Sequence, residues 1–209
     1  DGIADTNAYY ALTTDGRMLE IGNGFAEAAT GASRILNGRL AIMTDGSLWS
    51  CSVEYNDYYI TDDAISACED GEANYYVIKT DHSLWLTEMF SEDDTSSGTE
   101  IAHGYKDVAS FANELGGVGW PEFVLLDADN VLYYLDYIDG DGNLQLKKIA
   151  DNIAAFAFSS VTVENDCGTH FCIDTSGQLY ALGKNSYGVF GKGRTAGYSD
   201  TPVTVAFPN

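Results

Sequence analysis

Residues 40–49 read LAIMTDGSLW, with two apolar runs on either side of an Asp-Gly pair. The same ten-residue pattern occurs four more times, as YALTTDGRML at 10–19, YVIKTDHSLW at 76–85, VLLDADNVLY at 124–133 and FCIDTSGQLY at 171–180. An Asp-Gly pair between apolar runs is a strong signal for a β-hairpin with a type I′ turn, which needs positive φ at both central residues. We therefore predict five hairpins, near 9–21, 39–51, 75–87, 123–135 and 170–182.

The aligned copies also predict which side chains are buried. With a two-residue loop, Ile42 lies opposite Trp49 and Ile78 opposite Trp85 on one face of the sheet. The neighbouring column, apolar in all five copies, must then point to the other face, because strand side chains alternate. Both faces are therefore expected to be buried, with Ile42, Trp49, Ile78, Trp85 and Tyr180 in the core. Sheets stacked face to face around an axis, as in a β-propeller, bury both faces.

The spacing of the hairpins favours the same architecture. Successive turns are 30, 36, 48 and 47 residues apart, and 48 residues remain for the two chain ends together. A four-stranded propeller blade takes about 40–45 residues. We predict a single all-β domain over 1–209, a β-propeller with five blades of three to four antiparallel strands. In this prediction the N-terminal strand and residues Thr201–Ala206 join one sheet and close the propeller.

The last repeat has a longer signature, CGTHFCIDTSGQLYALGKNSYGVFGKGRTAGYSDTPVTV at 167–205. It resembles the regulator of chromosome condensation repeat family, in a divergent, bacterial-like form. The matching positions are Cys167, Gly168, His170, Gly183, Asn185, Gly188, Gly191, Gly193, Pro202 and Val203. The resemblance implies a propeller, usually of seven blades. The family's nuclear members bind chromatin and catalyse nucleotide exchange, which the charge of this chain argues against, whereas its bacterial members include secreted inhibitors of enzymes.

The charge of the chain narrows the choice of partners. There are 32 acidic residues against 10 basic ones, giving a net charge of −22 and a pI near 4.1. Such a surface repels nucleic-acid phosphates and anionic membranes. No apolar run approaches the roughly 20 residues of a membrane span, so we expect no membrane insertion. The charge itself indicates solubility, or alternatively a basic partner. We expect an extracellular or cell-surface monomer without a cofactor, and a protein or carbohydrate ligand.

Four cysteines leave the disulfide pattern open. Cys51 could pair with Cys68, and Cys167 with Cys172, although four cysteines allow three pairings. Alternatively, they are small buried apolar side chains. Cys172 lies in an apolar strand pattern, which favours burial for that residue.

One segment resembles a calcium loop. Asp139, Asp141 and Asn143 alternate within YIDGDGNLQ at 137–145, as oxygen ligands do in such loops. An EF-hand needs glycine at its sixth position and an acid at its twelfth, where this chain has Leu144 and Ala150. A polar hairpin loop is the better interpretation, and we predict no metal site there.

Catalytic motifs are missing from the sequence. His82, His103 and His170 lie far apart, and no HExxH, paired CxxC or GxSxG is present. We therefore predict no catalytic residues and a non-enzymatic interaction module that binds through the loops connecting its blades. The alternative is a carbohydrate-active hydrolase that uses two loop carboxylates.

Four aromatic residues outside the hairpins are the candidate ligand-binding residues. Tyr55, Tyr58 and Tyr59 lie in VEYNDYYI at 53–60, and Trp120 lies in LGGVGWPE at 115–122. Exposed Trp and Tyr side chains are favoured at recognition hot spots. For Tyr58 and Tyr59, packing in an outer strand is an equally good interpretation.

Overall fold

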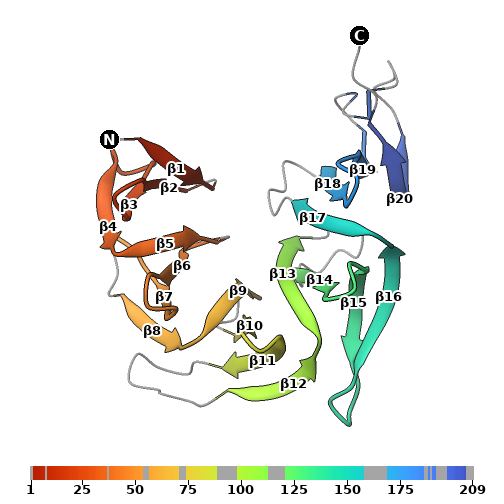
Figure 1. The fold of residues 1–209 in the computed structure, drawn as a ribbon, viewed down its shortest axis with the longest axis horizontal. Coiled ribbons are helices and arrows are strands. Elements are labelled where there is room, and N and C mark those ends of the chain that lie inside the picture. Colours follow the sequence, from red (N-terminus) through yellow and green to blue (C-terminus); the bar gives the residue numbers. More distant parts are fainter. Residues whose placement is uncertain are drawn as a thin grey trace. The chain divides into compact units, whose positions relative to one another are not determined.

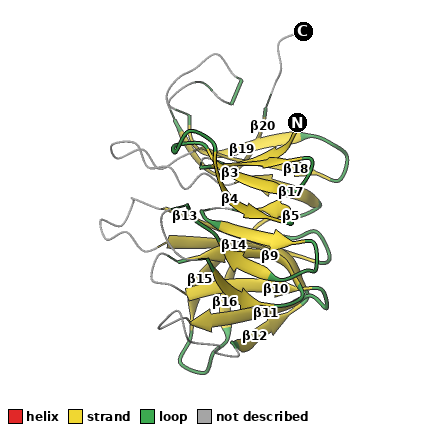
Figure 2. Cartoon of the chain, turned by 90° about the vertical axis from the view of Figure 1, so that its left-hand side faces the viewer, coloured by secondary structure: helices red, strands yellow, loops and turns green. Residues whose placement is uncertain are grey.

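The computed structural model describes residues 2–7, 9–36, 38–53, 57–70, 74–88, 98–112, 121–157, 169–185, 188, 190–191 and 197–205. Within these ranges the regular structure consists of strands, joined by turns and loops (Figure 2). None of the described residues forms a helix long and apolar enough to cross a membrane. The chain divides into two compact units, Asp1–Val108 and Ala109–Asn209, which are described in turn.

The first unit contains three sheets, each of four antiparallel strands (Figure 1). The first sheet has the order β1 (Ile3–Thr6), β2 (Tyr10–Thr13), β3 (Arg17–Glu20) and β4 (Ala26–Thr30). The second has the order β5 (Ala32–Ile35), β6 (Leu40–Met43), β7 (Leu48–Ser50) and β8 (Tyr58–Thr61). The third consists of β9 (Ala64–Glu69), β10 (Asn74–Lys79), β11 (Ser83–Glu88) and β12 (Thr99–His103).

Two further sheets follow, and the boundary between the units falls within the first strand of the fourth sheet. The fourth sheet has the order β13 (Tyr105–Ala112), β14 (Pro121–Asp127), β15 (Leu132–Ile138) and β16 (Leu144–Ala150). The fifth has the order β17 (Ile153–Ala157), β18 (Thr169–Asp174), β19 (Leu179–Lys184) and β20 (Tyr198–Thr204).

Five consecutive four-stranded antiparallel sheets define a five-bladed β-propeller, so the predicted fold class is confirmed. Each predicted hairpin forms the two middle strands of one blade, for example β6 and β7 in the second. The first two steps between turns, of 30 and 36 residues, are short, yet the blades there still contain four strands. The strands of the second blade are only three or four residues long, so four of them fit into a short repeat.

The hairpin turns differ from the predicted type I′ turn. In the second blade Gly46 donates its amide to the carbonyl of Met43 over 3.0 Å, and Met43 donates to Ser47 over 2.8 Å. Gly46 has φ of 87°, whereas Asp45 is not among the positive-φ residues. A three-residue loop of this kind combines a type I turn with one left-handed residue. Asp-Gly suits both turns, since each places glycine where φ is positive.

This turn changes the register by one residue. Ile42 lies opposite Leu48 and Ala41 opposite Trp49, so the predicted pairing of Ile42 with Trp49 is wrong. The same shift sets Val77, rather than Ile78, against Trp85. Each aromatic side chain therefore shares its face with a smaller residue, and the larger aliphatic pair occupies the opposite face.

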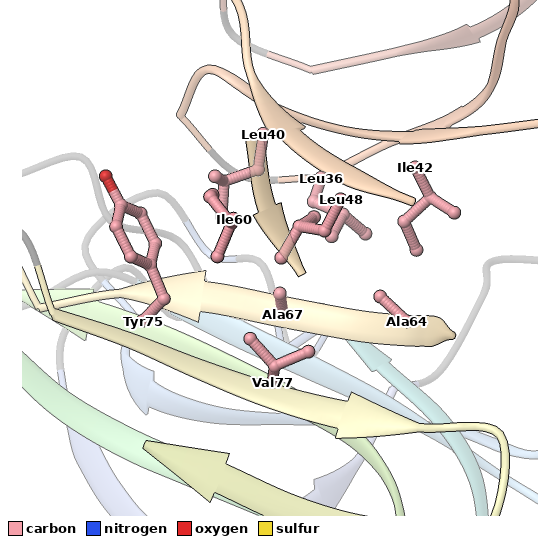
Figure 3. Close-up of a cluster of buried hydrophobic side chains, with 9 residues drawn as sticks. All are labelled: Leu36, Leu40, Ile42, Leu48, Ile60, Ala64, Ala67, Tyr75 and Val77. Atoms are coloured by element: carbon pink, nitrogen blue, oxygen red, sulfur yellow. The ribbon is translucent and has the colours of Figure 1, made fainter. Parts of the chain in front are cut away.

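Both faces of the second blade are buried, as predicted. On one face Leu40, Ile42 and Leu48 pack against the third blade, where they meet residues such as Ala67 and Val77. Figure 3 shows these side chains pointing toward one another from the two sheets. Fully burying one such aliphatic side chain contributes roughly 1.5–3 kcal/mol to folding. The stability of this unit therefore depends mainly on contacts between successive blades.

The opposite face of the second blade packs against the first blade. Its core contains Leu12, Met18 and Ala41, with Trp49 packed at the side. In the other unit, the cluster of Val124, Leu126, Leu132, Ile153, Cys172 and Leu182 joins the fourth and fifth blades in the same manner.

The aromatic column is less buried than the sequence predicted. Ile42 and Ile78 are 6% and 0% exposed, in agreement with the expectation. Trp49, Trp85 and Tyr180 are only half-buried. Their rings extend from the faces of the blades toward the turns, where hydrogen bonds hold their polar atoms.

The predicted closure by the two chain ends is wrong. β1 pairs with β2 in the first sheet, whereas β20 pairs with β19 in the fifth. Each end therefore completes its own blade. The spacing of the turns does not reveal β1, because all four of its residues are exposed and give no apolar alternation to identify a strand.

The described cysteines Cys51, Cys68 and Cys172 are buried and are not joined in a disulfide, so the possible Cys51–Cys68 disulfide does not form. Cys167 lies outside the described residues. Burial raises the pKa of Cys51 to about 12 and that of Cys172 to about 11. These side chains act as small apolar residues, as the alternative interpretation held.

The turn geometry predicts a position-specific cost for adding a side chain. Gly46→Ala should lower the free energy of unfolding by about 1 kcal/mol, because alanine rarely adopts positive φ. The nearest atom to an added Cβ is 4.0 Å away, so crowding contributes little. Gly22→Ala is the control, since Gly22 has no positive φ and no atom within 4 Å of the added Cβ. Equal effects in urea denaturation would contradict the assignment of this turn.

Candidate functional site

Two of the four predicted binding residues, Tyr55 and Trp120, lie outside the described residues. Tyr58 is half-buried, and its hydroxyl forms a hydrogen bond with that of buried Tyr75. It therefore fits the alternative interpretation, packing in an outer strand. Tyr59 is 39% exposed and approaches Trp49 edge to face, with 5.7 Å between the ring centroids.

An open depression lies beside Trp49, at the junction of the first and second blades. Its volume is about 510 Å³. Residues 27–31 of β4 and its end form one wall, and the β6–β7 hairpin forms the other. The hairpin residues that line it are Met43, Thr44, Asp45, Ser47 and Trp49, and Asp57 completes the lining. We call this feature the Trp49 depression.

Two hydrogen bonds fix the indole of Trp49 in this depression. Trp49 donates Nε1–H to Ser47 Oγ over 2.9 Å, and Ser47 donates its hydroxyl to Asp45 Oδ1 over 2.6 Å. The same carboxylate oxygen accepts the backbone amide of Ser47 over 3.0 Å. An aromatic ring that is held by its polar edge leaves its face available for contacts.

Other blades attach their aromatic residue to the turn in related ways. In the third blade Trp85 donates to Ser83 over 2.7 Å, and Ser83 donates to Asp81 over 2.5 Å. In the fifth blade Tyr180 donates its hydroxyl directly to Asp174 over 3.1 Å. The acids of the turns therefore serve the fold as well as the surface charge.

The Trp49 depression is strongly acidic. Its lining includes Glu27, Asp45 and Asp57, and none of its described lining residues is a lysine or arginine. The hydrogen bonds from Ser47 hold the pKa of Asp45 below its usual range, so this carboxylate stays charged in mildly acidic solution. Burial, together with Asp62 and further acids nearby, raises the pKa of Tyr59 to about 12. Tyr59 is therefore neutral near pH 7.

The first unit carries most of the negative charge. Twenty of the 32 acidic residues and five of the ten basic residues lie in residues 1–108. Within this unit Arg17 forms an ion pair with Asp15 over 3.1 Å, and the ammonium of Lys79 lies 4.6 Å from the ring centroid of Trp85. Both cations are thus engaged away from the Trp49 depression.

The loop that resembles a calcium site is a hairpin turn between β15 and β16, as the favoured interpretation held. Asp139 Oδ1 accepts the backbone amides of Asp141 and Asn143 over 3.0 and 2.9 Å. Its other oxygen accepts the side-chain amide of Gln145 over 3.0 Å. These bonds give the acid at position 139 a structural role in the turn.

His82, His170 and the half-buried acid Glu69 have different structural surroundings. His82 has φ of 69° in a hairpin turn, and its Nδ1 lies 3.0 Å from the carbonyl oxygen of Tyr105. His170 is 7% exposed, and burial lowers its pKa to about 4. Glu69 has a pKa that burial raises, as a general acid requires, yet it does not line the Trp49 depression.

Comparison with known proteins identifies the class of fold. The crystal structure of human WBSCR16 matches with a TM-score of 0.50 and 14% identity, covering 81% of this chain and 50% of that one. BBS1N in complex with ARL6DN matches with TM-scores of 0.53 and 0.51 in its lead-soaked and mercury-soaked crystals. The identities are 13% and 11%, and the matches cover 86% and 82% of this chain and 57% and 59% of BBS1N.

The similarity to these structures concerns the fold alone, which in this chain is a β-propeller. This chain spans between 50% and 59% of the length of those structures. No protein-family profile matches the sequence, and no curated protein matches it either.

The hydrogen bonds around Trp49 predict a change in the titration of one acid. Ser47→Ala removes the hydroxyl that is the main cause of the lowered pKa of Asp45. The pKa of Asp45 should therefore rise toward its usual range, measured from its side-chain carboxyl resonance in NMR. Ser83→Ala is the matched control, since it should change the pKa of Asp81 and leave that of Asp45 unaltered.

Buried His170 predicts a pH dependence of stability. Its folded pKa of about 4 lies below the ordinary value of 6.5, so the unfolded chain binds more protons between these values. The contribution of neutral His170 to the free energy of unfolding is fully present above about pH 6.5 and is lost as the pH falls toward 4. The difference in unfolding free energy between wild type and His170→Gln should change across this window, measured by denaturation under circular dichroism. A difference independent of pH would contradict the buried neutral state.

Proposed function

We propose that this chain is a non-enzymatic interaction module that binds a partner protein at the Trp49 depression. The observation that carries the proposal is the combination of an anchored, half-buried indole with carboxylates in one open cavity. Trp is enriched among the residues that dominate binding energy at interfaces. Acidic groups around such a residue favour basic partners and speed their encounter.

One of the structures with a similar fold is in keeping with this proposal. BBS1N, a structure of similar fold, was crystallised in complex with ARL6DN. Fold alone does not determine function, so the argument rests on the chemistry of the depression.

Two buried residues of the fifth blade are in keeping with the resemblance to the regulator of chromosome condensation repeats. Two of the matching positions, His170 and Asn185, are buried in the fifth blade, where a structural repeat residue belongs. Asn185 accepts the backbone amide of Phe190 over 3.0 Å and so ties Phe190 to the end of β19. We propose membership of this repeat family for that blade. An extracellular or cell-surface location, a carbohydrate ligand and the monomeric state stay predictions from the sequence.

Peptide selection tests the proposed function. Random dodecapeptides displayed on phage and selected on the immobilised chain should yield binders whose affinity falls at least about tenfold with Trp49→Ala, as for a central aromatic contact. Because Trp49 also packs against the core, Asp57→Asn is the second variant. It changes an exposed lining residue and should weaken binding while leaving the melting temperature unaltered.

Two outcomes would contradict the proposal. Selected peptides that bind wild type and both variants equally would place recognition elsewhere. Release of reducing ends from a panel of oligosaccharides, abolished by Glu69→Gln, would favour the hydrolase alternative instead.

A further inference from the structure

The second and third blades build the same aromatic anchor at equivalent positions. Trp49 and Trp85 occupy the same column of the repeat, and both follow the pattern Asp-x-Ser-x-Trp. Their indole nitrogens donate to Ser47 and Ser83 over 2.9 and 2.7 Å. Each indole ring is therefore held to its turn by the same kind of hydrogen bond. The third blade can then be compared directly with the second.

The two blades differ in what lies over the ring. In the third blade, Lys79 places its ammonium 4.6 Å from the ring centroid of Trp85. A cation within about 6 Å of an indole centroid is attracted by the negative face of the ring. The corresponding residue of the second blade is Met43, which carries no charge and lines the Trp49 depression. None of the hairpin residues that line the Trp49 depression is a lysine or arginine.

The charged side chains around Trp49 favour a cation over an anion. Glu27, Asp45 and Asp57 line the same cavity. Tyr59 packs beside the indole, with 5.7 Å between the ring centroids, and helps to hold it in place. The volume of about 510 Å³ lies within the range of small-ligand pockets, so one extended side chain fits with room to spare.

We propose that the Trp49 depression takes a lysine side chain of the partner protein, in the role that Lys79 has at Trp85. Its ammonium lies against the indole face of Trp49, with Glu27 and Asp57 as counter-charges. This inference rests on the proposed function and adds the chemical class of the group recognised. The net charge of −22 then has a specific use, since it draws basic segments toward this unit.

An NMR titration with defined probes tests the inference. The probe is a glycine–serine peptide with a central lysine, and its matched control has acetyl-lysine, which keeps the aliphatic stem of lysine but removes the charge. The lysine peptide should shift the indole Nε1–H resonance of Trp49, while the acetyl-lysine peptide should bind at least about tenfold more weakly. Equal shifts from both peptides would overturn the inference.

Exchanging the two equivalent residues gives the sharpest variants. Met43→Lys should supply the missing internal cation and weaken the lysine peptide at Trp49 by at least about tenfold. Lys79→Met should uncover Trp85, so that the peptide now shifts the Trp85 resonance as well. Unchanged binding to both folded variants would contradict the proposed role of the ring.

Charge neutralisation separates the site from the overall charge. Asp57→Asn should weaken the lysine peptide, whereas Asp136→Asn, which removes one exposed acid outside the depression, should not. Equal effects would mean unspecific attraction and would overturn the inference. If selected peptides depend on Trp49 but contain no basic residue, the interaction module stands and the lysine site is wrong. If no peptide depends on Trp49, both fail.

Discussion

Successive blades are tied together by backbone hydrogen bonds at residues with positive φ, and the packing of this protein depends on them. In the first unit Gly16 accepts the amide of Ala32 over 3.0 Å, and Gly31 accepts that of Thr44 over 2.9 Å. Asn152 accepts the amide of Thr175 over 2.8 Å in the other unit. Gly31 and Asn152 have φ of 80° and 61°, which turns their carbonyls toward the next hairpin. These bonds fix where each blade begins relative to its neighbour within a unit, and the apolar faces then meet.

The candidate site follows from this arrangement. The Trp49 depression is bounded by the end of one blade and the hairpin of the next, which the bond between Gly31 and Thr44 holds together. Ser47 and Asp45 then fix the indole from the turn side. The wall of the cavity is therefore supported by hydrogen-bonded backbone, so a ligand meets a surface that needs little rearrangement. Preorganisation of this kind reduces the ordering cost of association.

The sequence predicts the fold better than it predicts the candidate site. The five hairpins were readable because apolar columns flank a residue that tolerates positive φ, whether Gly46, His82 or Asn130. The register was not, since Asp-Gly fits two turn types that differ by one residue. Trp49 was expected in the core because both faces of the blade are apolar, whereas its ring reaches the turn at Ser47. The depression could have been found by comparing Lys79 with Met43 between repeats. The shape of the depression depends on how the end of β4 lies against the next blade, and no local sequence pattern predicts that arrangement.

The strand order has a consequence for the history of the chain. Every described blade uses four strands that are consecutive in sequence, and β1 and β20 each stay within their own sheet. A blade is thus encoded by one uninterrupted stretch of gene. Duplication or deletion of that stretch adds or removes a complete sheet and leaves every remaining strand with its partners. Copies can then diverge one at a time, so that a lysine kept over the ring in one blade is free to be replaced in another.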